Sequence, residues 1–199
     1  ERQSLIHSFS VEDQSTINIM VLHGDVVSQG QSSDYNPISV EDIKNSKLDY
    51  LALGHRHGFS KITKTGDTFW GYSGNPEGRG FDELGPKGVI VGELTKGYCN
   101  LRFREICKRK YYEEKIDISG AATYEDIIQK IHEQIEDGDK NKNLYKVVLT
   151  GEMPEDVTVN TSVIQQKLEN DFYFIKIIDD TRIKIDYDVL ENEFSLKGI

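Results

Sequence analysis

Two short apolar runs in the first half of the chain each end at a histidine. Residues 17–24 read Ile-Asn-Ile-Met-Val-Leu-His-Gly, and residues 48–58 read Leu-Asp-Tyr-Leu-Ala-Leu-Gly-His-Arg-His-Gly. Apolar runs of this length that stop near glycine predict buried β-strands. The pattern therefore places histidine at the exits of two strands, His23 after the first and His55 with His57 after the second.

The rest of the first half alternates between polar connections and further strands. Residues 26–37 are rich in Ser, Gln, Gly and Asp without periodicity, which predicts a loop. Ser39 with Asp42 three residues later predicts the cap of a short helix. Two β-hairpins follow, with strands at 59–63 and 68–72 and at 88–94 and 98–106. A βαβ piece followed by antiparallel hairpins predicts a mixed α/β first domain over residues 1–106.

From residue 107 onward the pattern predicts a separate small α/β module. Its expected order is strand 111–118, helix 124–137 capped by Thr123, strand 146–150, helix 162–170 and strand 172–178. Apolar residues recur on one face of the first helix, as in a helix that packs on a sheet. Nothing in this module resembles a catalytic set, since its single histidine, His132, falls in a helix on a mostly charged face.

The composition is that of a globular protein. Of the 199 residues, 37% are hydrophobic and 29% charged, which provides enough apolar material for a buried core. No apolar run approaches the ~18 residues of a membrane span, so no membrane contact is expected. The two cysteines, Cys99 and Cys107, argue against a disulfide scaffold and favour a reducing, cytoplasmic location.

The net charge of −10 lies entirely in the second half of the chain. Residues 1–110 carry 14 Lys and Arg against 14 Asp and Glu, whereas residues 111–199 carry 10 against 20. This acidity disfavours a broad nucleic-acid surface in the second half. A basic cluster precedes it, formed by Arg102, Arg104, Lys108, Arg109 and Lys110. Such a cluster is either a solvated face or a contact for phosphates.

The three histidines at the strand exits are candidate metal ligands. Parallel strands that lie side by side bring their carboxyl ends to one edge of a sheet, so His23, His55 and His57 are expected to converge there. Neutral imidazole is the commonest protein ligand of transition metals, and three imidazoles suffice to hold an ion. The alternative is that the two histidines flanking Arg56 form only a polar turn. No acidic or asparagine motif in the chain completes an obvious two-metal site.

A glycine-rich segment, residues 73–88, is the second candidate for a binding function. It holds five glycines and two prolines in sixteen residues. Glycine allows close approach of the backbone and arginine suits the geometry of phosphate, so Asn75 and Arg79 are candidate phosphate contacts. The alternative is an ordinary connecting loop between two hairpins.

Taken together, these segments resemble the calcineurin-like metallophosphoesterases. The resemblance is carried by Leu-His-Gly at 22–24, Asp-Tyr-Leu-Ala-Leu-Gly-His-Arg-His at 49–57, Ser-Gly-Asn-Pro-Glu-Gly-Arg at 73–79 and Glu-Leu-Gly-Pro-Lys-Gly at 83–88. Within the family, the sequence is most similar to the DNA-repair exonuclease branch of SbcD-like and YhaO-like proteins. The resemblance implies the C-terminal part of a layered αββα sandwich over residues 1–106, followed by a small α/β capping domain over 107–199.

The resemblance also implies a site with two divalent cations, for which Mn²⁺ is the expected ion. His23 and His55 match ligands of the second metal, and His57 matches a ligand of the first. The family's Asp-x-His, Gly-Asp and Gly-Asn-His-Asp or Gly-Asn-His-Glu motifs do not occur at matching positions. We therefore expect a portion of a longer protein whose catalytic residues lie upstream of Glu1, and we expect this chain alone to be inactive.

For the longer protein, the resemblance implies a metal-dependent DNA exonuclease or endonuclease of DNA repair that hydrolyses phosphodiester bonds. Its implied partners are DNA and a coiled-coil ATPase of the SbcC type, and exposed sheet edges also allow a homodimer. Two alternatives stay open. One is a metallophosphodiesterase that acts on a nucleotide or another small diester, and the other is a non-catalytic interaction module.

Overall fold

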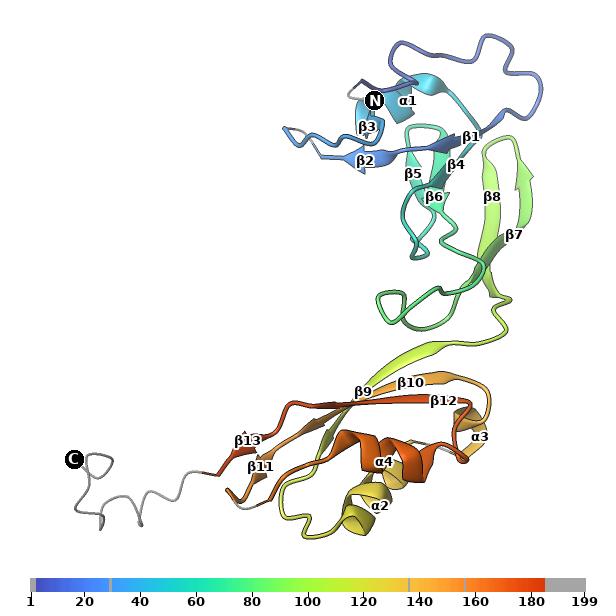
Figure 1. Cartoon of the computed structure of the whole chain (residues 1–199). Coiled ribbons are helices and arrows are strands. Elements are labelled where there is room, and N and C mark those ends of the chain that lie inside the picture. The colour runs from blue at the N-terminus through green and yellow to red at the C-terminus, as the bar shows by residue number, and fades with distance from the viewer. Residues whose placement is uncertain (1–2, 29, 136, 156, 185–199) are drawn as a thin grey trace, which may run out of the picture. The chain divides into compact units, whose positions relative to one another are not determined.

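The computed structural model describes residues 3–28, 30–135, 137–155 and 157–184 (Figure 1). The chain divides into two compact units, Glu1–Lys110 and Tyr111–Ile199. Each unit has its own cluster of buried apolar side chains. The sequence predicts the domain boundary slightly earlier, between residues 106 and 107.

Unit 1 is built on a four-stranded sheet in the order β1-β4-β6-β5. The strands are β1 (Ile19–His23), β4 (Tyr50–Gly54), β5 (Thr63–Thr65) and β6 (Thr68–Tyr72). β1, β4 and β6 run parallel, and β5 lies antiparallel beside β6. The predicted hairpin is present, but its first strand is Thr63–Thr65 rather than 59–63, because the backbone pairs with β6 up to a tighter turn. Since His23 pairs in register with Gly54, the two strands that precede the candidate histidines end side by side.

Two short parallel strands and one helix connect β1 to β4. β2 (Asp25–Val27) pairs with β3 (Pro37–Ser39), and α1 (Val40–Ser46) follows. The predicted helix cap is confirmed, because Ser39 Oγ accepts from the Asp42 backbone N–H and Asp42 Oδ2 accepts from the Ser39 N–H, both at 3.0 Å. β2 and β3 occupy the two ends of the segment that the sequence predicts as a loop, since the backbone pairs across it.

The hairpin predicted at the end of unit 1 is also confirmed. It consists of β7 (Gly88–Thr95) and β8 (Tyr98–Glu105), which pair antiparallel. Lys96 at its turn reaches Asp49 at the start of β4, with 2.7 Å between Nζ and Oδ2, so the hairpin is tied to the main sheet. The buried core of unit 1 comprises Ile6, Ile38, Ile43, Leu48, Leu51, Leu53 and Tyr72.

Unit 2 has a parallel three-stranded sheet in the order β12-β10-β9, with two helices on the same side of it (Figure 1). In chain order its elements are β9 (Tyr111–Asp117), α2 (Tyr124–Gln134), α3 (Asp137–Lys140), β10 (Leu144–Thr150), β11 (Glu152–Met153), α4 (Thr161–Leu168), β12 (Phe174–Asp179) and β13 (Arg182–Ile183). The β-α-β-α-β order predicted from the sequence is confirmed. α2 ends at Gln134 rather than at residue 137, because Ile135 turns to extended backbone and buries its side chain.

Both units combine helices with largely parallel sheets, which confirms the α/β fold class predicted from the sequence. Within the ranges that the structure describes, no helix has the length and apolar content needed to cross a membrane. The exits of β1 and β4 carry the candidate site.

Candidate functional site

His23 and His55 lie next to each other at the exits of β1 and β4. Their ring centroids are 5.3 Å apart and the rings meet edge to face, at 77°. Gly54 lies against the first imidazole, since a Cβ at that position would make a tight contact of 3.3 Å with His23 Nδ1. The glycine of the Gly-His-Arg-His turn thus leaves room for the first imidazole as well as presenting the second.

The backbone of His55 is strained. Its φ of +116° lies in the region that L side chains rarely adopt. Such outliers cost about 1–3 kcal/mol each and cluster at functional sites, where the surrounding structure holds them in place. The ring of Tyr35 stacks on the His55 imidazole, with centroids 4.8 Å apart and planes at 28°. Tyr35 comes from the loop between β2 and β3, and nothing in the sequence pattern pointed to it.

The turn that follows His23 is fixed by a buried asparagine. Asn36 Nδ2 donates to the His23 carbonyl oxygen at 2.9 Å. Gly24 is required beside it, since a Cβ there would lie 2.7 Å from both Asn36 Nδ2 and Asn36 O. The Tyr72 hydroxyl donates to the Gly24 carbonyl at 3.0 Å and accepts from the Val26 N–H at 2.9 Å. The position of the first candidate ligand is therefore set by the core of unit 1.

Arg56, between the two histidines of the turn, points back toward β2. Its Nη2 lies 2.9 Å from Asp25 Oδ1, and the guanidinium carbon is 5.2 Å from the centre of the Tyr72 ring. The hydrogen bond with Asp25 raises the pKa of Arg56 above its ordinary value. Arg56 thus attaches the turn to the body of unit 1. The two histidines beside it have different partners, since His55 lies against His23 and Tyr35 whereas His57 contacts Glu83.

His57 belongs to a cluster around a buried carboxylate, that of Glu83. His57 Nδ1 is 2.5 Å from Glu83 Oε1. Asn75 Nδ2 and the Arg79 backbone N–H both donate to Glu83 Oε2 at 3.0 Å, and Arg79 Nη2 donates to Oε1 at 3.3 Å. Both predicted phosphate contacts, Asn75 and Arg79, therefore share one carboxylate with a predicted metal ligand. Glu83 itself was not singled out from the sequence.

Glu83 is ionised in this setting. Burial would raise the pKa of its carboxyl group, but the hydrogen bonds from Arg79, Asn75 and His57 outweigh that effect and bring the pKa to about 2. Only 6% of the residue is exposed. The negative charge is balanced by the Arg79 guanidinium, which is itself mostly exposed.

The glycine-rich segment also binds the C-terminal part of the basic cluster, at Lys108 and Arg109. Glu77 accepts from the backbone N–H groups of Lys108 at 2.8 Å and Arg109 at 3.1 Å. Lys110 Nζ pairs with Glu105 at 2.8 Å. Residues 73–88 thus do more than connect two hairpins, because they are bonded both to the histidine turn and to the chain that leaves β8.

The histidines meet some of the requirements of a metal centre. His23 and His55 form a neighbouring pair of imidazoles, a donor set suited to a transition metal. Within the described ranges, no three His, Cys, Asp or Glu side chains gather closely enough to hold an ion. The structure therefore brings two of the three predicted ligands together, while His57 contacts Glu83 and Arg79. An ion held at this pair would need further donors beyond the two imidazoles.

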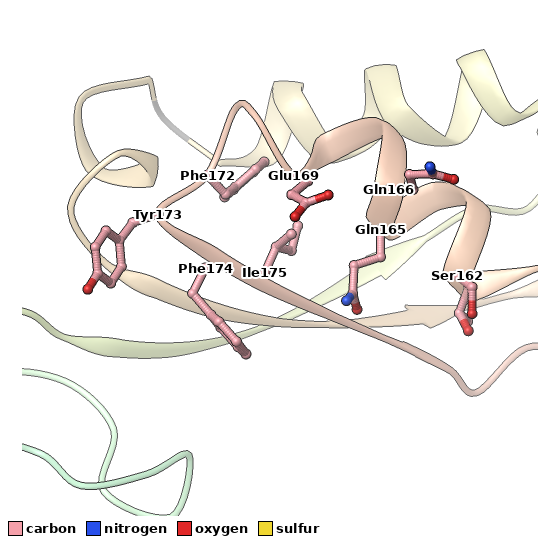
Figure 2. A pocket seen from close by; sticks show the side chains of 9 residues that line it. Ser162, Gln165, Gln166, Glu169, Phe172, Tyr173, Phe174 and Ile175 are labelled. Carbon is pink, nitrogen blue, oxygen red and sulfur yellow. The ribbon is translucent and has the colours of Figure 1, made fainter.

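The described residues of unit 2 form hollows, but no comparable chemical group of side chains is found among them. Figure 2 shows one of about 380 Å³ between α4 and β12. Its lining comprises Thr161, Ser162, Gln165, Gln166, Glu169, Phe172, Tyr173, Phe174 and Ile175. A lone carboxylate among amides and aromatic rings is not a catalytic set. His132 lies 3.0 Å from Lys140 Nζ through Nδ1 and 3.3 Å from Asp171 through Nε2, so both ring nitrogens have protein partners.

Comparison with known proteins supports the family suggested by the motifs. No protein-family model matches the chain. The chain is 25% identical over 140 residues to the uncharacterized metallophosphoesterase YhaO of Bacillus subtilis (strain 168). The match covers 69% of this chain and 34% of the relative, so the chain spans about a third of the relative's length. The motifs, the mixed α/β fold and this weak similarity together support the metallophosphoesterase family for the chain.

Proposed function

We propose that this chain is part of a two-metal-dependent phosphodiesterase that acts on DNA, as an exonuclease or endonuclease of DNA repair. The observation that carries the proposal is the pair His23 and His55, which adjacent parallel strands deliver to one sheet edge with His55 in strained backbone. Ligands of α/β sheets bind at such carboxyl edges. Two divalent cations, Mn²⁺ in this proposal, supply an activated water and stabilise charge on the phosphodiester.

The residues of the chain have separate roles in this scheme. His23 and His55 bind one ion, and His57 contributes to the other. Arg79 and Asn75 contact the phosphate, to which the exposed guanidinium of Arg79 has access. The described residues include no further ligands beside the histidine pair, so the chain alone is expected not to hydrolyse phosphodiesters.

Exposed arginines support DNA as the substrate. Arg102 and Arg104 alternate along β8 and are both exposed, which places them on one face of the strand. Unit 1 carries no net charge, so these side chains are not offset by a strongly acidic surround. The proposal includes a cytoplasmic location and a coiled-coil ATPase of the SbcC type as partner, with a homodimer as a further possibility.

One alternative function has an observation in its favour. Because no three metal-binding side chains gather among the described residues, a non-catalytic interaction module would account for the same histidine turn. A metallophosphodiesterase for small diesters would use the same ligands and differs only in substrate.

Titration of Mn²⁺ by calorimetry tests the histidine pair directly. In a longer protein that contains this segment, we expect His23→Ala and His55→Ala each to remove binding of one ion. His7→Ala is the matched control, because the His7 side chain is exposed and its ring pairs with Asp42 rather than with the histidine turn. Unchanged binding in both pair variants would show that the histidine turn is structural.

Nuclease assays test the substrate. A longer protein that contains this segment should degrade linear DNA with Mn²⁺, and His55→Ala should lower the rate by about 100-fold or more, because changes of the groups behind metal ligands already cost about 10- to 100-fold. Hydrolysis of small model diesters without hydrolysis of DNA would overturn the DNA assignment and favour the small-diester alternative.

A further inference from the structure

His57 is held by residues 73–88 at its backbone and at its ring. The backbone carbonyl oxygen of His57 accepts from the Asn75 N–H at 3.1 Å and from Lys87 Nζ at 3.4 Å. Gly74, at φ +73°, is needed for this approach, since a Cβ there would lie 2.8 Å from His57 O. The ring contacts Glu83 through Nδ1. Backbone and side chain of His57 are thus both fixed by one loop.

We propose that Glu83 is a positioning residue, which accepts the Nδ1–H of His57 and thereby selects, for the uncharged form of the ring, the tautomer with its lone pair on Nε2. The use of Nε2 as a metal ligand rests on the proposed function, whereas the tautomer itself does not. An ionised carboxylate can only accept hydrogen bonds. The ring nitrogen that faces Glu83 therefore carries the proton, and in the neutral ring the other nitrogen is unprotonated.

The orientation of the Glu83 carboxylate is set by donors other than the histidine. Asn75 Nδ2 and the Arg79 backbone N–H both bind Oε2, which directs Oε1 toward His57 Nδ1. Metal-binding histidines commonly donate their second ring nitrogen to a carboxylate in this way, which fixes the orientation of the ring.

Arg79 lies beside the same ring but does not by itself decide between the two ring nitrogens. Its Nη2 lies 3.3 Å from His57 Nδ1 and 3.5 Å from Nε2. A guanidinium only donates, so while Nδ1 donates to Glu83 only Nε2 can accept from Arg79. Because the Arg79 side chain is 71% exposed, the guanidinium can move away from Nε2 when an ion or a phosphate binds.

The isosteric substitution Glu83→Gln makes a sharp test. Two donors, Asn75 Nδ2 and the Arg79 N–H, occupy the Oε2 side, so the amide oxygen of Gln is expected there and its NH₂ group toward His57. An NH₂ group donates, so Nδ1 must accept and the proton must move to Nε2. A role in packing alone predicts no such inversion, because the two side chains have nearly the same shape.

Long-range ¹H–¹⁵N correlation spectra of the whole chain without metal report the tautomer, when they are recorded at a pH at which the nitrogen shifts show an uncharged His57 ring. The His57 signals are assigned by their loss in His57→Ala. We expect Nδ1–H in the wild type, Nε2–H in Glu83→Gln, and the wild-type pattern in Asp82→Asn, whose exposed carboxylate is the matched control. An Nε2–H tautomer in the wild type would overturn the proposal without any variant. An unchanged tautomer in folded Glu83→Gln would also overturn it.

Metal binding then separates this proposal from the proposed function. In a protein that binds Mn²⁺ at His57, Glu83→Gln should weaken that binding by about 10- to 100-fold, because the ligand nitrogen now carries a proton. Wild-type affinity in the variant would overturn the positioning role. A protein that binds no Mn²⁺ but shows the expected tautomers would refute only the proposed function.

Discussion

His55 combines an unfavourable backbone conformation with a contact on its ring. Replacement by glycine removes the strain at φ +116°, while replacement by alanine keeps it, and both lose the stack with Tyr35 equally. We therefore expect His55→Gly to be about 1 kcal/mol more stable than His55→Ala, after allowance for the greater freedom of glycine in the unfolded chain. Urea denaturation of the two variants measures the difference. If the alanine variant were the more stable, His55 would not be strained, and its backbone would give no reason to assign it a function.

The loop of residues 73–88 is attached to the histidine turn through the carboxylate of Glu83. Burial opposes ionisation, but the hydrogen bonds prevail and the pKa falls from 4.5 to about 2. Since the pKa is lower in the folded state, the attachment contributes its full stability above about pH 4.5 and loses it as the pH falls toward 2. Glu83→Gln should therefore be less stable than the wild type at neutral pH, by roughly 1.5–3 kcal/mol, and nearly equal to it near pH 2.

Urea denaturation at several pH values, followed by Trp70 fluorescence, measures this difference within unit 1. Asp82→Asn controls for the removal of a nearby carboxylate that is exposed. A deficit of Glu83→Gln that stayed constant from neutral pH to acid would mean that shape rather than charge attaches the loop.

The elements that could be predicted are those whose signals lie within a few residues. The capping boxes at Ser39 and Thr123 begin helices where expected, and the apolar runs before His23 and His55 form strands. β1 is not buried as expected, since it lies at the edge of its sheet with Ile19 and Val21 exposed. β2 and β3 were missed, because three-residue strands in a polar segment carry no periodicity. The end of α2 was placed too late. Ile135 continues the apolar spacing of the helix, but its backbone is extended and its side chain is nevertheless buried.

Only the part of the candidate site that follows from the order of the strands could be predicted from the sequence. Two adjacent parallel strands that end in histidine imply neighbouring imidazoles, and His23 and His55 are neighbours. The carboxylate that holds His57 lies 26 residues further along the chain, and such a contact depends on the path of a loop rather than on a pattern. Tyr35 was missed for the same reason. The ligand roles of the three histidines stay predictions.

At the scale of the whole molecule, each unit has its own buried core, and the two cores should respond separately to substitution. Trp70 is the single tryptophan and packs against the core of unit 1. Ile164 and Leu51 are both fully buried, the first in unit 2 and the second in unit 1. Truncation of either to alanine should cost its own unit about 2–5 kcal/mol.

Two probes of unfolding distinguish the cores. Leu51→Ala is expected to lower the urea midpoint of Trp70 fluorescence, whereas Ile164→Ala should leave that midpoint in place and shift only the part of the far-ultraviolet circular dichroism that comes from unit 2. Coincident shifts of both probes in Ile164→Ala would mean that the units unfold as one. Substitutions at the histidine turn would then also change unit 2, and their effects on metal binding could no longer be assigned to unit 1 alone.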